Sequence, residues 1–271
     1  MKINFEINSK EYSCDTLESI DISIPMIFSG EQPNTYGVAE AASKAVETAD
    51  FTGDTRRGGS CNFEEYKLIP HCNGTHTECV GHISLERISI HDILKDSFIP
   101  STLISVTPEK ALDTKDNYIP QKNENDFLIT KKILSAKLKG ADKNFLNGLI
   151  VRTLPNDDSK KTRQYMKQLP PFFSIEAMQY VVDFNVQHLL MDIPSVDRTF
   201  DEGKLTAHHI FWNVPLESHE VDNENHSMKT ITEMIYASNE IKEGNYLMNI
   251  QIPDFTADAA PSRVMIYKVK C

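Results

Sequence analysis

Apolar residues recur along the chain with the period of two that is typical of strands, or in short continuous runs that are typical of buried strands. These patterns predict strands at residues 1–6, 21–26, 103–106, 148–154, 186–191, 246–252 and 264–269. Pro25 marks an edge or an end of its strand, because proline cannot donate a hydrogen bond to a neighbouring strand. Strands therefore provide most of the regular structure that the pattern predicts.

Helical spacing of apolar residues is clearest at residues 174–182, where Ser174 is suited to cap the first turn. A second helix is predicted at residues 230–238. Residues 37–48 are rich in alanine and predict a short helix or an ordered loop. Residues 127–138 fit a helix and a strand equally well. Helices are thus few and interspersed among the strands.

This mixture of elements predicts an α/β fold with a layered or barrel-like sheet. Residues 69–82 are expected to form a loop or irregular strand, residues 113–126 a polar surface insertion and residues 156–161 a solvated loop. No change in composition marks a boundary. We therefore expect residues 1–271 to form a single domain.

The charge balance excludes several classes of partner. The net charge is −11, and no Lys/Arg-rich run with interleaved aromatic residues occurs. Nucleic acid and anionic membrane surfaces are therefore not expected as partners. No apolar run approaches the length of a membrane span or a signal peptide. Five cysteines, an odd number, fit a reducing compartment better than a disulfide framework, so we expect a cytoplasmic protein.

Metal-binding side chains are concentrated in residues 70–82, which contain three imidazoles, two thiols and one carboxylate. His76 and Glu78 are two residues apart, so extended backbone would project both side chains from one face. Gly74 is expected to let the backbone turn tightly beside an ion. A divalent ion lowers the pKa of bound water from 15.7 to about 7, which amide hydrolysis at neutral pH requires.

Residues 74–78 together with His82 resemble the His-x-Gly-Thr-His-x-Asp-x-x-x-His signature of the cyclase family, which includes bacterial kynurenine formamidases and isatin hydrolases. Further stretches resemble family motifs in the same order, at residues 21–25, 186–197, 207–211, 233–235 and 239–241. The resemblance implies a swivelling β/β/α fold, with a twisted, barrel-like mixed sheet flanked by helices. It also implies a homo-oligomeric hydrolase that uses zinc or manganese.

The resemblance further implies that His76 and Glu78 bind the metal, with Glu78 in place of the family's aspartate. The third ligand has two readings. Without a gap in the match, Cys72 replaces the family's histidine, and a thiolate is a good zinc ligand. With a one-residue slip, the ligand is His71 and Cys72 is packing. We favour Cys72, because that reading needs no gap.

The remaining family positions imply a proton carrier and a second ion. His82 corresponds to a general base or to a residue that orients the ligands. His208 and Glu233 correspond to ligands of a second metal, with His209 as a rival for His208. The stretch between them is longer than expected for the family, and residues 217–226 are expected to loop out.

These residues predict a metal-dependent hydrolase that cleaves a carbon–nitrogen bond in a small amide, formamide or cyclic amide, as an arylformamidase does. Two alternatives follow from the altered ligands. One is a diverged member that binds a metal or a small molecule without turnover. The other is a closed structural zinc site with the four ligands Cys72, His76, Cys79 and His82.

Aromatic residues that could stack on a substrate are Trp212, Phe28, Tyr36 and Phe63. Two carboxylates, Asp192 and Asp197, lie near Ser195, but their spacing does not match a nucleophile elbow. For this pair we predict a structural role.

Overall fold

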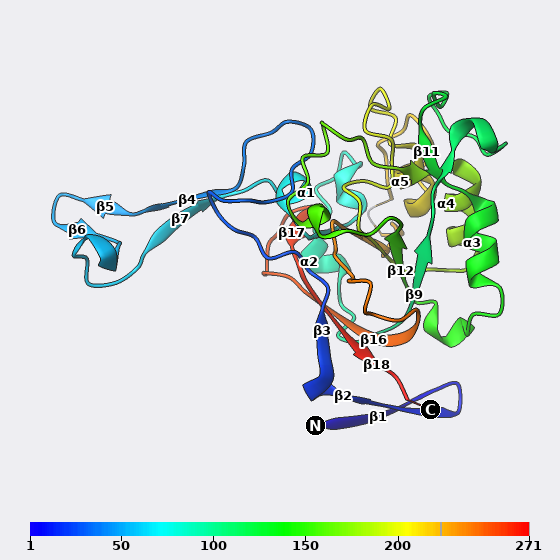
Figure 1. Cartoon of the computed structure of the whole chain (residues 1–271), viewed down its shortest axis with the longest axis horizontal. Coiled ribbons are helices and arrows are strands. Elements are labelled where there is room, and N and C mark those ends of the chain that lie inside the picture. The colour runs from blue at the N-terminus through cyan, green and yellow to red at the C-terminus, as the bar shows by residue number, and fades with distance from the viewer. Residues whose placement is uncertain (223, 271) are drawn as a thin grey trace.

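A curled nine-stranded sheet forms the centre of the computed structural model, which describes residues 1–222 and 224–270 (Figure 1). Its strands, in spatial order, are β17 (Ala259–Pro261), β8 (His76–Glu78), β15 (Thr230–Glu233), β14 (His188–Met191), β12 (Gly148–Thr153), β9 (Ile99–Val106), β16 (Gly244–Gln251), β18 (Arg263–Lys268) and β3 (Ser19–Asp21). The four strands β15, β14, β12 and β9 are parallel, and the strands outside them pair antiparallel.

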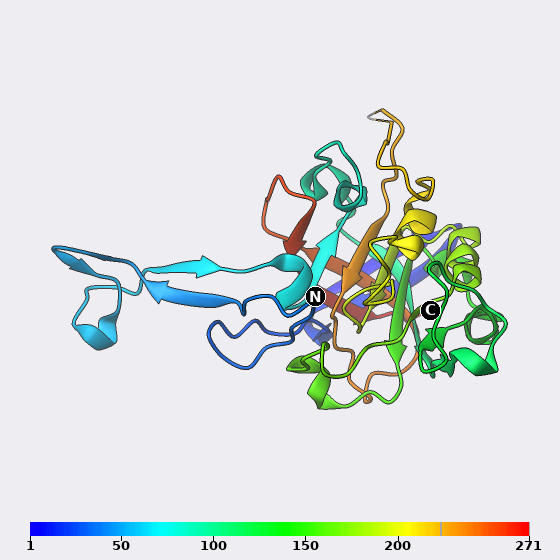
Figure 2. The ribbon, with the colours of Figure 1, turned by 90° about the horizontal axis from the view of Figure 1, so that it is seen from above.

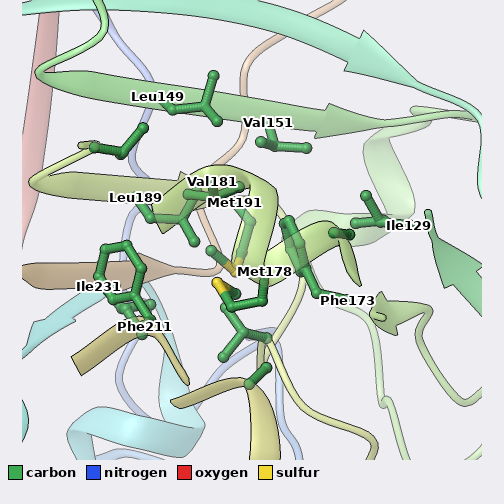
Figure 3. Close-up of a cluster of buried hydrophobic side chains, with 14 of the residues drawn as sticks. Ile129, Leu149, Val151, Phe173, Met178, Val181, Leu189, Met191, Phe211 and Ile231 are labelled. Atoms are coloured by element: carbon green, nitrogen blue, oxygen red, sulfur yellow. The ribbon is translucent and has the colours of Figure 1, made fainter. Parts of the chain in front are cut away.

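One face of the parallel strands is covered by α4 (Ile175–Asp183) and α5 (Thr206–Trp212), with α3 (Lys131–Leu138) beside α4. Figure 3 shows the core between them, where Leu149 and Leu189 of neighbouring strands face Met178 of α4. Alternate residues of the same strands, Ile150 and Leu190, belong to a second core. Both faces of the central strands are therefore buried, as is usual for parallel sheets.

The second core fills the concave side of the curled sheet. Ile150 and Leu190 pack there with Met248 of β16 and Ile266 of β18. The hairpin of β1 (Lys2–Ile7) and β2 (Lys10–Asp15) lies outside this sheet, beside the C-terminal strand (Figure 1). The sheet thus closes part of a barrel, and the helices remain on its outer face.

The remaining elements are short. The strands are β4 (Ala42–Ala45), β5 (Glu47–Thr48), β6 (Phe51–Thr52), β7 (Glu64–Lys67), β10 (Glu109–Lys110), β11 (Phe127–Ile129) and β13 (Phe172–Phe173). The α-helices are α1 (Pro70–Asn73) and α2 (Ile90–Ile93). Single 3₁₀ turns are η1 (Thr16–Glu18), η2 (Thr55–Arg57), η3 (Val80–His82), η4 (Ala111–Asp113), η5 (Lys143–Phe145) and η6 (Asp158–Lys161). Together, β4 and β7 form an arm that projects from the body, with β5 and β6 at its tip (Figure 2).

Several predicted elements are confirmed. The helix at 174–182 is α4, and the Ser174 side chain accepts a hydrogen bond from the Ala177 amide at 3.0 Å. The ambiguous residues 127–138 contain both β11 and α3. Within the described residues, no helix combines the length and apolar character that a membrane crossing requires.

Three sequence predictions are wrong. Residues 230–238 begin with β15 rather than a helix, because Thr230–Glu233 pairs with strands on both sides. Residues 37–48 contain the strands β4 and β5, not a helix. The loop at 156–161 is not fully solvated, because the Lys160 side chain is buried.

Candidate metal centre

The short strand β8 places His76 and Glu78 on one face of the sheet. Thr77 points the other way, and its hydroxyl lies 2.8 Å from that of Thr232 on β15. The β8–β15 register sets Glu233 directly opposite His76. His76, Glu78 and Glu233, all predicted from the sequence, therefore meet near the C-terminal end of the parallel strand β15.

Three further segments complete the cluster around Glu78. The Glu78 Oε2 atom lies 2.9 Å from His71 Nδ1 of α1 and 4.0 Å from His82 Nε2 of η3. The Glu78 Oε1 atom lies 2.8 Å from His208 Nε2 of α5. One buried carboxylate thus contacts three imidazoles from separate parts of the chain.

Two buried atoms in this cluster have no hydrogen-bond partner, which is unusual because such atoms are costly to bury unpaired. They are His76 Nε2 and Glu78 Oε2. The contact between Glu78 Oε2 and His71 Nδ1 does not meet hydrogen-bond geometry. The Gly74 carbonyl accepts a hydrogen bond from His76 Nδ1 at 2.9 Å, so the lone pair of this imidazole is on Nε2. A lone pair and a carboxylate oxygen aimed into one buried space fit a cation.

Ligand atoms in the cluster are close enough to share ions. Those of His71, His76 and Glu78 lie within 4.8 Å of one another, and so do those of Glu78, His82 and His208. Glu78 belongs to both groups. The Glu233 Oε2 atom lies 3.4 Å from His76 Nε2, and its Oε1 atom lies 3.9 Å from His208 Nε2. The side chains could therefore hold one ion or two neighbouring ions, with Glu78 a candidate ligand in both groups.

The electrostatics of the cluster favour exchange of protons for a cation. Burial opposes ionisation of Glu78, but the rings of His82 and His208 outweigh it and hold its pKa well below the ordinary value. Burial and the charge of Glu78 raise the pKa of Glu233. Burial alone would lower the pKa of His208, but Glu78 and Asp197 raise it well above the ordinary value. A divalent ion would compete with protons for these side chains, because its ligands must be deprotonated.

His208 is held by a carboxylate for which a different role was predicted. Asp197 Oδ2 lies 2.5 Å from His208 Nδ1, and the Asp197 carboxylate also accepts a hydrogen bond from the Ala207 amide at 2.6 Å. The buried Tyr118 hydroxyl donates to Asp197 at 2.6 Å. The predicted structural role of Asp197 therefore includes fixing the ring of His208. Asp192 instead pairs with Lys160, away from the cluster.

His71 and His82 share a second carboxylate, Asp258, which sequence reasoning missed. The Asp258 Oδ2 atom lies 2.8 Å from His71 Nε2 and 3.4 Å from His82 Nδ1. The two rings stack with their centroids 4.2 Å apart. Burial would lower the pKa of His71, but the contacts with Asp258 and Glu78 raise it to about 10.

A family model described as "Putative cyclase" matches residues 20–198, well over half of the chain. This chain belongs to the Cyclase family. The match includes the candidate metal-binding segment at residues 70–82 and ends before the segments that supply His208 and Glu233. No curated protein sequence matches the chain.

Solved structures share the fold along nearly the whole chain. A predicted metal-dependent hydrolase from Bacillus stearothermophilus is 16% identical, with a TM-score of 0.58, and the match covers 92% of this chain and 98% of that one. Isatin hydrolase A from Labrenzia aggregata is 11% identical, with a TM-score of 0.61 and coverages of 92% and 93%. Isatin hydrolase A from Ralstonia solanacearum is 11% identical, with a TM-score of 0.60 and coverages of 92% and 91%. The predicted cyclase-like fold is confirmed.

In this Cyclase-family chain the geometry supports His71, not the favoured Cys72, as the neighbour of His76 and Glu78. None of the groups of described residues that could hold an ion includes Cys72. Its thiol is buried, and burial together with the charge of Glu233 raises its pKa to about 11. The one-residue slip is therefore the reading that fits the structure.

Replacement of Cys72 by alanine should accordingly leave the amount of bound zinc per chain unchanged, whereas replacement of His71 by alanine should reduce it. Elemental analysis after zinc reconstitution and dialysis measures both. Loss of zinc from the Cys72→Ala variant, with zinc retained by His71→Ala, would restore the ungapped reading.

Other predicted residues lie outside the cluster. His209 contacts the Val214 carbonyl at 3.3 Å and so does not replace His208. Cys79 packs with Ile90 and Ile93, which does not support a closed zinc site that includes it. Gly74 has φ of 161°, which is ordinary extended backbone, so the tight turn expected there is absent. Gly81 is the constrained glycine, because a Cβ there would meet the Ile88 carbonyl at 2.0 Å.

Of the four aromatic candidates, Tyr36 and Trp212 lie beside the cluster. Tyr36 is 44% exposed, and desolvation followed by the charge of Glu233 raises the pKa of its hydroxyl. Trp212 packs in the core behind His208, with ring centroids 5.1 Å apart. Phe28 contacts Tyr66 of β7, and Phe63 contacts Phe51 on the arm. Tyr36 is therefore the aromatic residue placed to meet a substrate.

Proposed function

We propose that this protein is a metal-dependent hydrolase that cleaves a carbon–nitrogen bond in a small amide, formamide or cyclic amide. The observation that carries the proposal is the pair of buried atoms without a hydrogen-bond partner, His76 Nε2 and Glu78 Oε2, in the shared space between the histidines. Membership of the Cyclase family and fold neighbours described as metal-dependent hydrolases and isatin hydrolases support it.

In this proposal His71, His76 and Glu78 hold one ion. Glu78 and His208 hold a second, with Glu233 beside both. The metal supplies Lewis acidity and lowers the pKa of water that it binds. Imidazole and carboxylate ligands suit both zinc and manganese, and without a thiolate the argument that favoured zinc is weaker.

The protein's own side chains would handle protons and orientation. The side chain of His82 is 27% exposed, whereas those of His76, Glu78 and His208 are buried, so His82 connects the cluster with solvent. It is the residue best placed to pass a proton from water to a leaving nitrogen. Asp197 fixes the His208 ring, and Tyr36 can contact a small substrate beside Ser195.

The proposal predicts that zinc- or manganese-reconstituted protein hydrolyses a member of a panel of N-formyl anilides, lactams and cyclic imides. His82→Gln should lower kcat by about 10²-fold or more, since general acid–base groups contribute about 10²–10⁴-fold. Metal content should be measured on the same samples. A full complement of metal with no turnover of any panel member would count against the hydrolase proposal.

That outcome would favour a second candidate, a Cyclase-family member that binds a metal or small molecule without turnover. The substitution that motivates this alternative is Glu78, one methylene longer than the family's aspartate. Activity that appears only in a Glu78→Asp variant would support the non-catalytic role. The expected homo-oligomer, cytoplasmic location, and absence of nucleic-acid and membrane partners stay predictions.

A further inference from the structure

The geometry points to Asp258 as the residue that positions His71 for metal binding and His82 for proton transfer, and this inference rests on the proposed metal centre. Asp258 lies outside the part of the chain that the family model matches. It precedes β17, and its carbonyl accepts a hydrogen bond from the Cys79 amide at 3.1 Å. The carboxylate is therefore anchored beside β8.

Each of the two rings has one nitrogen near Glu78 and the other near Asp258. His71 contacts Glu78 through Nδ1 and Asp258 through Nε2. His82 approaches Glu78 through Nε2 and Asp258 through Nδ1. If Asp258 accepts N–H groups from both rings, their lone pairs are left on the nitrogens that face Glu78. Carboxylates commonly fix metal-binding histidines in this way.

The geometry favours this role over direct binding of an ion by Asp258. The ligand atoms of His71, His82 and Asp258 are also within 4.8 Å of one another. However, the Asp258 side chain is 36% exposed, and an ion there would leave His76 Nε2 and Glu78 Oε2 without a partner. An ion on the Glu78 side satisfies both buried atoms.

The substitution Asp258→Ala should raise the zinc dissociation constant by about 10- to 100-fold without changing the number of ions bound at saturation. Asp258→Asn should raise it less, because the amide oxygen can still accept one of the N–H groups. The dissociation constant is measured by competition with a chelator. Asp254→Ala is the matched control, because Asp254 lies on the same segment but pairs with His91, and it should bind zinc like the wild type.

Nitrogen-15 NMR of labelled imidazoles provides a readout that a purely structural role would not change. In the zinc-loaded protein, the N–H protons on His71 Nε2 and His82 Nδ1 should show the downfield shift of groups that donate to a carboxylate, and Asp258→Ala should lose that shift. If Asp258→Ala fails to fold, Asp258→Asn provides the same comparison.

Two results would overturn the inference while leaving the metal centre intact. One is an unchanged dissociation constant in both Asp258 variants. The other is complete loss of one equivalent of zinc in both variants, which would make Asp258 a ligand. A wild-type protein that binds no zinc or manganese would refute the metal centre and this inference together.

Discussion

A Glu78→Ala variant is expected to lose both metal ions and to reduce hydrolysis by more than about 100-fold. Removal of a residue that only orients a ligand typically costs 10- to 100-fold, and a bridging ligand should cost more. Glu78 has this larger effect because its two oxygens contact His71 and His208, and because it belongs to both groups of ligand atoms. Zinc per chain and kcat/KM on the panel substrate are the measurements.

The matched control for this variant is Glu65→Ala. Glu65 is an exposed glutamate on the arm that pairs with Lys44, far from the cluster in the fold, and its replacement should change neither quantity. Far-UV circular dichroism of the metal-free proteins separates loss of ligand from loss of fold. Full zinc occupancy in a folded Glu78→Ala protein would contradict the assignment of Glu78 as the bridging residue.

Local sequence patterns predicted the central strands well but failed at β15. Residues 230–238 carry Ile231, Met234 and Ile235 at helical spacing, which suggested a helix. In the fold, Thr230–Glu233 instead pairs with β14 and β8, and Met234 then adopts φ of 53° and ends the strand. Pairing with two neighbours overrides the weak local preference of four residues.

The choice between Cys72 and His71 also depends on local structure that the family match does not show. The ungapped match selects Cys72, four residues before His76. Residues 70–73 form one helical turn, in which consecutive side chains diverge by about 100°. That turn directs His71 toward Glu78 and leaves Cys72 near Glu233.

The residues that orient the ligands are separated from them by long stretches of sequence. Asp258 lies 187 residues from His71, and Tyr118 lies 79 residues from Asp197. No local pattern relates such pairs, and only the fold brings them together. The family resemblance supplied His76, Glu78, His82, His208 and Glu233 because a motif preserves the order of ligands. It could not supply partners that lie outside the motifs.

A second large effect is expected at Lys160, whose replacement by methionine should lower the free energy of unfolding by about 3–5 kcal/mol. The Lys160 side chain is 2% exposed. Its ammonium donates to the Thr153 carbonyl at 2.7 Å, to the Thr153 hydroxyl at 2.9 Å and to Asp192 Oδ2 at 2.7 Å. Methionine has a similar length but no charge, so the buried Asp192 carboxylate would lose its counter-ion.

The position of the Lys160–Asp192 pair explains why its loss should lower the free energy of unfolding so much. Asp192 follows β14, and its carboxylate also accepts hydrogen bonds from the amide and the hydroxyl of Thr153 at the end of β12. The pair therefore ties the ends of two central strands. Burial lowers the pKa of Lys160 and raises that of Asp192, so each charge depends on the other for its stability.

The measurement is urea unfolding of the metal-free protein, with Lys161→Met as the control. Lys161 is the next residue and carries the same charge, but it is partly exposed and pairs with an exposed Asp158 at 3.1 Å. Its replacement should cost no more than about 1 kcal/mol, as is usual for surface ion pairs. The double variant Lys160→Met with Asp192→Asn should recover part of the loss, because the uncompensated charge is removed. Equal stabilities for the Lys160→Met and Lys161→Met proteins would show that Asp192 is neutral in the fold and that the pair does not stabilise it as an ion pair.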